Sequence, residues 1–124
     1  VKKSKAEKLF SKYIRKWVNK TWLGWWKIDI IYLGFKKYSE LDVKDAYHSV
    51  ALCHTDWKYL TATIYVNSKV LKNCDDIEYI AVHELMHIFL NETQEDGIEH
   101  EERVATILAR SFIFLNNQKV KKNE

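Results

Sequence analysis

Apolar side chains recur at helical spacing in the first twenty residues. Between residues 4 and 18, one face of such a helix carries Leu9, Phe10, Tyr13, Ile14 and Trp17. Lysines occupy the opposite face. The pattern predicts a basic amphipathic helix within residues 1–20.

The middle of the chain alternates with a period of two rather than 3.6. In residues 25–33 the side chains of Trp26, Ile28, Ile30 and Tyr32 fall on one side of an extended chain. Residues 47–54 and 59–66 are also rich in β-branched and aromatic residues, which predicts two further strands in a meander. The polar residues 34–45 are predicted to form a turn and a loop.

Two helices are predicted after these strands. The first spans about residues 76–90 and the second about residues 98–116, with a turn-rich break between them and a frayed tail at 117–124. The predicted fold is α+β. It is a single domain over residues 1–124 with a small, mostly antiparallel sheet, the N-terminal helix and the two C-terminal helices.

Composition limits the class of protein. The chain has 124 residues, of which 47% are hydrophobic, enough for one packed core. No apolar run approaches the length of about 18 residues that a membrane span needs, and no apolar segment follows the basic start as in a signal peptide. The two cysteines, Cys53 and Cys74, are expected to be reduced. We therefore expect a cytoplasmic protein without a membrane partner.

Charge is divided unevenly along the chain. Residues 1–20 carry eight Lys or Arg and one Glu, a net charge of +7, whereas the remainder carries −4. A lysine-rich helix face is usually solvated, so nucleic-acid binding is an alternative that we do not favour. The five tryptophans are expected to fill the core rather than to form a stacking surface for single-stranded nucleic acid. Residues 75–102 hold ten acids and no Lys or Arg, which suits a divalent cation.

The segment from His83 to His87 is an H-E-x-x-H motif within the first of the two C-terminal helices. The four-residue spacing places both imidazoles on one helical face, where they can bind a single metal ion. Glu84 points alongside and can reach a water molecule on that ion. Most of the other residues of this helix are apolar, so the polar trio is expected to be buried or half-buried, which is costly without a partner. Zinc is the expected ion.

A catalytic zinc site needs a third protein ligand. Three candidates lie at the start of the last helix, at 13 to 15 positions after His87: His100, Glu101 and Glu102. Glu101 lies near the centre of the apolar face that Val104, Ala105, Leu108 and Phe112 define, so it is the preferred ligand. Glu102 and His100 remain as alternatives.

The motif and the acids that follow it resemble the zincin metallopeptidases, in particular the branch with a glutamate ligand, the gluzincins. The segment from about Trp57 to Ala109 also looks like small metallopeptidases of phage and prokaryotic genomes. The matching residues are Trp57, Tyr59, Ala62 and Ile64 in a strand, then Glu101, Glu102 and Val104 in the final helix. The related SprT-like proteases have a third histidine, which His100 would match.

The resemblance implies a zincin-like fold and hydrolysis of a peptide bond in a peptide or protein substrate. It also implies that zinc acidifies a water molecule and that Glu84 is the general base. It also implies a substrate strand paired with an edge strand, for which Thr61–Val66 is the best match. The candidates for oxyanion stabilisation are Tyr47, His48, His54 and Tyr59. Two other functions stay open: a SprT-like protease acting on DNA-bound proteins, and a catalytically silent, zinc-stabilised binding or accessory protein.

Overall fold

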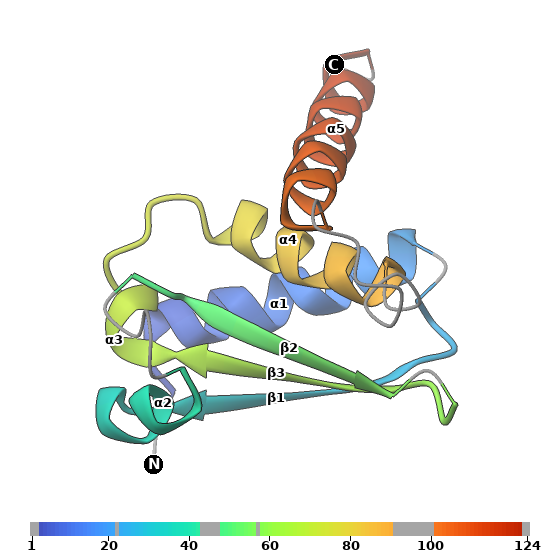
Figure 1. The fold of residues 1–124 in the computed structure, drawn as a ribbon. Helices are drawn as coiled ribbons and strands as arrows, with labels where there is room; N and C mark the ends of the chain where they lie inside the picture. Colours follow the sequence, from blue (N-terminus) through green and yellow to red (C-terminus); the bar gives the residue numbers. More distant parts are fainter. Residues whose placement is uncertain (1–2, 22, 43–47, 57, 91–100, 123–124) are drawn as a thin grey trace.

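A three-stranded sheet forms one layer of the protein, and helices α1 and α4 pack together on one of its faces (Figure 1). The structure is a computed structural model that describes residues 3–21, 23–42, 48–56, 58–90 and 101–122. In chain order the elements are α1 (Lys5–Lys20), β1 (Lys27–Leu33), α2 (Phe35–Leu41), β2 (Ala51–Asp56), β3 (Thr61–Asn67), α3 (Ser68–Leu71), α4 (Ile77–Phe89) and α5 (Glu101–Lys122). The α+β class agrees with the prediction.

The sheet is mixed, with strand order β1-β3-β2. β1 runs parallel to β3 with Ile30 opposite Ile64, and β2 runs antiparallel to β3 with Cys53 opposite Ile64. The predicted mostly antiparallel meander is therefore wrong for β1, which lies beside β3 rather than β2. Alternation reveals which face of a strand is buried but not which strand is its neighbour, and this explains the error.

β3 is the central strand, so the prediction that Thr61–Val66 is an edge strand is wrong. Both of its sides are hydrogen-bonded, to β1 and to β2. Its side chains at Ala62, Ile64 and Val66 are buried on the face that the helices cover. Among the described strands, β1 and β2 are the edges of the sheet.

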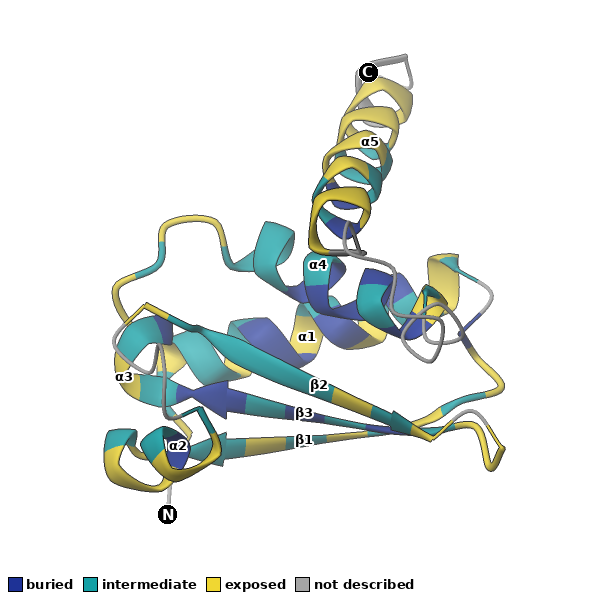
Figure 2. Cartoon of the chain, in the orientation of Figure 1, coloured by how far each residue is buried: buried dark blue, intermediate teal, exposed yellow. Residues whose placement is uncertain are grey.

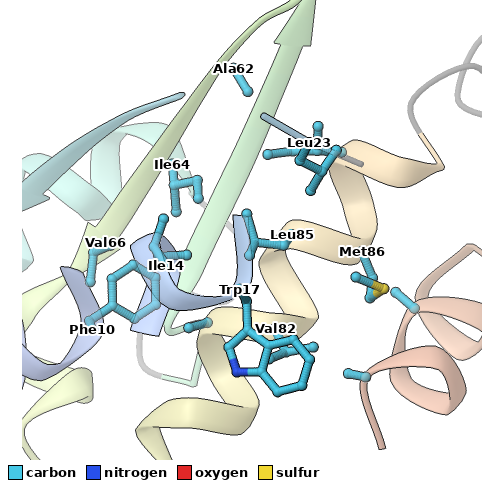
Figure 3. Packing of buried hydrophobic residues seen from close by; sticks show 14 of the residues in the cluster. Phe10, Ile14, Trp17, Leu23, Ala62, Ile64, Val66, Val82, Leu85 and Met86 are labelled. Carbon is cyan, nitrogen blue, oxygen red and sulfur yellow. The ribbon is translucent and has the colours of Figure 1, made fainter. Parts of the chain in front are cut away.

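The core lies between this face of the sheet and the two helices (Figure 3). Phe10 and Ile14 of α1 meet Ile64 of β3, and Leu85 of α4 packs in the same cluster. All four are at most 3% exposed. Because apolar burial supplies most of the folding free energy, this cluster fixes α4 and its polar side chains relative to the sheet.

Helix α4 begins after Asp76, whose carboxylate accepts a hydrogen bond of 3.0 Å from the backbone N–H of Tyr79. This is a standard N-cap, and the acid also suits the helix dipole. Buried and intermediate residues make up nearly all of the helix (Figure 2). Its observed ends lie within one residue of the predicted range 76–90.

Other predicted boundaries differ more. Residues 35–41 form α2 where a loop was predicted, and β2 begins at Ala51 rather than at residue 47. The predicted frayed tail at 117–124 is wrong as far as Lys122, because α5 continues to that residue. Glutamine and lysine are good helix formers, which is consistent with a helix that continues through exposed positions.

Helix α5 packs on α4 near its start and then extends away from the rest of the chain (Figure 1). Its fully buried residues are Ala105 and Ala109, whereas Phe114 and Leu115 are each 61% exposed. None of the described helices is long and apolar enough to cross a membrane.

One polar link joins α1 to α4. The Glu78 carboxylate accepts hydrogen bonds from Lys16 Nζ at 2.7 Å and from the indole N–H of Trp17 at 3.0 Å. Burial raises the pKa of Glu78, but the two hydrogen bonds outweigh it and hold this pKa below its ordinary value. The carboxylate therefore stabilises the fold above its ordinary pKa of 4.5, and this contribution is lost as the pH falls through the lower pKa of the folded state.

Glu78→Ala is expected to lower the free energy of unfolding by about 1–3 kcal/mol, because the indole N–H of Trp17 loses its acceptor inside the protein. Glu78→Gln keeps an oxygen in place and is the control, with a much smaller expected loss. Urea unfolding at pH 7 measures both. Equal losses from the two variants would contradict this role of the hydrogen bond.

Candidate metal centre

His83 and His87 lie one turn apart on α4, on the side that faces the start of α5. Their ring centroids are 4.9 Å apart and the rings are nearly perpendicular, at 86°. The two side chains are 13% and 15% exposed. The sequence-based expectation of half-buried histidines on one face is confirmed.

Glu102, in the first turn of α5, brings its carboxylate to both imidazoles. Oε1 lies 2.9 Å from Nε2 of His83, and Oε2 lies 3.0 Å from Nε2 of His87. The two Nε2 atoms therefore converge on one small region, with a carboxylate from a different helix on its far side. The Glu102 side chain itself is 72% exposed, so this region is open to solvent.

Glu84 lies on the inner side of the site and is only 6% exposed. Its Oε1 is 3.6 Å from Nδ1 of His83. Ligand atoms of His83, Glu84 and His87 all lie within 4.8 Å of one another. A carboxylate buried to this extent requires nearby positive charge or hydrogen-bond donors, which the imidazole and a bound cation would both supply.

The charge around His83 favours its protonated form. Burial by itself lowers the pKa of His83, but the carboxylates of Glu84 and Glu102 outweigh it and raise the pKa above its usual value. The same negative charge attracts a metal cation. Imidazole nitrogen and carboxylate oxygen are also ligands that Zn²⁺ accepts in proteins.

The two nitrogen–oxygen distances can be compared with those between ligands of a zinc ion. Zinc binds histidine nitrogen and carboxylate oxygen at about 2.0–2.2 Å, so neighbouring ligand atoms of a tetrahedral site lie about 3.4 Å apart. The observed nitrogen–oxygen distances of 2.9 and 3.0 Å are shorter by a few tenths of an ångström. Because Glu102 is an exposed residue at the start of a helix, its side chain can withdraw by that amount.

The site lies in a cleft of about 730 Å³. α4 forms one side of it, α5 contributes Glu102 and Thr106, and β2 with the residues before it forms another side. The residues that line it are Asp42, His48, Ser49, Val50, Ala51, Leu52, Cys53, Tyr79, Ile80, His83, Glu84, His87, Glu102 and Thr106. The volume is that of a ligand-binding cleft rather than of an internal packing defect.

The structure brings together His83, Glu84 and His87 of the predicted site, and it adds Glu102 from the alternatives. The side chain of Glu101, the preferred third ligand, lies outside the described part of the chain, and so does His100. The role predicted for Glu101 therefore stays a prediction.

Of the candidates for oxyanion stabilisation, His48 lines the cleft. His54 is exposed and Tyr59 is 76% exposed, and neither lines the cleft. Tyr47 lies outside the described residues.

Sequence reasoning missed Tyr79 and Thr106. Tyr79 lies one turn before His83, and its ring centroid is 5.9 Å from that imidazole. The guanidinium of Arg110 lies over the ring of Tyr79, 5.3 Å from its centroid. Tyr79 lies four residues before His83, and Thr106 lies four residues after Glu102. This helical spacing is the signal that could have identified both residues.

Comparison of the chain with protein-family models, with curated proteins and with solved structures gives no match.

Proposed function

We propose that the protein is a zinc-dependent metallopeptidase of the zincin type. The observation that carries the proposal is the convergence of three side chains from two helices: Nε2 of His83 and of His87 meet the two carboxylate oxygens of Glu102. Glu84 is buried next to them, with its Oε1 3.6 Å from Nδ1 of His83. The cleft next to these groups has room for a segment of peptide.

His83, His87 and Glu102 would hold the ion, which leaves one tetrahedral position open to solvent. When bound, zinc acidifies water and polarises a carbonyl group. Glu84 then has the role of general base: its carboxylate accepts a proton and returns it to the leaving amine. Burial beside His83 favours this role, because it limits the water that competes for the carboxylate.

The shape of the cleft supports an extended peptide as substrate. β2 is an edge strand, and Val50, Ala51, Leu52 and Cys53 line the cleft beside the histidines. Within the part of the chain that the structure describes, β2 pairs with a strand on one side only, that of β3. A peptide that adds to this edge gains main-chain hydrogen bonds with little dependence on its sequence. The edge strand proposed to pair with the substrate is therefore β2 and not Thr61–Val66.

The proposal predicts one zinc ion per chain and zinc-dependent proteolysis. The protein is stripped with a chelator, reloaded with zinc and analysed by elemental mass spectrometry, and hydrolysis of an unfolded protein such as reduced casein is followed in each state. We expect activity in the reloaded protein only. A folded protein that retains no metal after reloading would rule out the site. A protein that binds zinc but does not hydrolyse casein would instead support the catalytically silent, zinc-stabilised alternative.

A further inference from the structure

Four basic side chains form a row along the exposed side of α1. These residues, the cationic row, are Lys5, Lys8, Lys12 and Arg15. They follow one another at steps of three and four, and all four are exposed. The buried residues of α1 occupy the opposite side of the helix, so the row faces away from the core and from α4.

No carboxylate in the described part of the chain forms an ion pair with the cationic row. The neighbouring Lys16 differs, because it pairs with Glu78 of α4. Residues 1–20 carry a net charge of +7 against −4 for the rest of the chain. The positive charge is therefore concentrated on one surface that is free to bind anions.

The row leads into a hollow at the end of α1. Asn19 continues the spacing of the row one turn after Arg15. The hollow has a volume of about 380 Å³, and the residues that line it are Val18, Asn19, Lys20, Thr21, Gly24 and Trp25. It therefore combines a cation, short polar side chains and an indole ring at the end of a cationic surface.

Trp25 differs from Trp17 and Trp26, the other tryptophans that the structure describes. It is 80% exposed, whereas Trp17 is 3% exposed and Trp26 packs partly buried against the core. An indole ring left in water next to Lys20 gains from any flat aromatic group that stacks on it. The expectation that the tryptophans serve as core therefore holds for Trp17 and not for Trp25.

We propose that α1 and Trp25 form a binding site for single-stranded nucleic acid. Phosphates lie along the cationic row, and one base stacks on Trp25 in the hollow. From Lys5 to Asn19 the site is about 21 Å long at 1.5 Å per residue. A single strand fits better than a duplex, because its bases are free to leave the stack and meet an exposed ring. The inference does not rest on the metal centre.

The test uses fluorescence anisotropy with labelled oligo(dT) and oligo(U) of twelve nucleotides, a duplex of the same length, and poly-glutamate as competitor. If four phosphates are neutralised, the logarithm of the binding constant should fall with the logarithm of salt with a slope of about −3. Binding of either single strand supports the proposal, and the stronger one identifies DNA or RNA. Equal binding of the duplex, or displacement of the oligonucleotide by poly-glutamate, would overturn it.

Two variants separate the cations from the ring. Changing the whole cationic row to glutamine should reduce the salt slope to near zero. The matched control changes four other exposed lysines to glutamine: Lys36, Lys37, Lys58 and Lys72. It removes the same charge and should leave the slope in place. Trp25→Leu should weaken single-strand binding about tenfold, which corresponds to the loss of one base-stacking contact. The salt slope should not change. No change with Trp25→Leu, or equal loss in the control, contradicts the site.

Discussion

Glu84→Gln is expected to lower the rate of casein hydrolysis by about 10²–10⁴-fold while the protein still binds one zinc ion per chain. The amide has nearly the shape of the carboxylate but cannot accept the proton. The ligands His83, His87 and Glu102 are untouched, so metal content should not change. Initial rates at saturating zinc and elemental analysis of the same samples provide the two readouts.

Glu78→Gln is the matched control for this experiment. Glu78 is the other acid of α4, but it faces α1, where it pairs with Lys16. The same loss of charge on the same helix should leave the activity unchanged. If both variants hydrolyse casein at the wild-type rate with zinc in place, Glu84 is not the base and the zinc-stabilised, non-catalytic alternative gains support.

Glu102→Gln is expected to weaken zinc binding by more than about 100-fold. Removal of a group that only supports a ligand already costs about 10–100-fold, and here a ligand itself loses its charge. Because the Glu102 side chain is 72% exposed, the substitution should leave the fold intact. Competition with a chromophoric chelator measures the affinity, and circular dichroism checks the helices.

The same measurement on Glu101→Gln decides between neighbouring acids. The contacts of Glu102 with both imidazoles favour it as ligand, so Glu101→Gln should keep the wild-type affinity. If Glu101→Gln loses zinc and Glu102→Gln does not, then Glu101 is the third ligand, as the helical phase of the sequence predicts.

The local part of the site was predictable because its spacing lies within one helix. The H-E-x-x-H motif and the apolar residues around it place α4 to within one residue at each end. The partner from α5 was harder to predict, because it depends on which face of that helix is buried. The helical phase placed Val104 on the buried face of this helix, yet Val104 is 39% exposed.

The contact face of α5 is instead centred on two small residues, Ala105 and Ala109, which are fully buried. At 100° per residue, Glu102 lies only about 20° from Ala109 around the helix axis. Small side chains allow close approach of two helices but add little to a hydrophobic pattern, so the larger apolar residues shifted the predicted centre of this face away from the two alanines. The order of the strands could not be predicted from the hydrophobic pattern either, because it depends on pairing between distant segments.

The face by which α5 contacts α4 is centred on two alanines, Ala105 and Ala109, which contribute little buried area. Leu108, Phe112 and Ile113 add partly buried apolar contacts with the core. If the proposed site holds zinc, an ion shared by His83, His87 and Glu102 would tie the start of α5 to α4 in addition to these contacts. We therefore expect removal of zinc to loosen the start of α5, and with it the side of the cleft to which Glu102 and Thr106 belong.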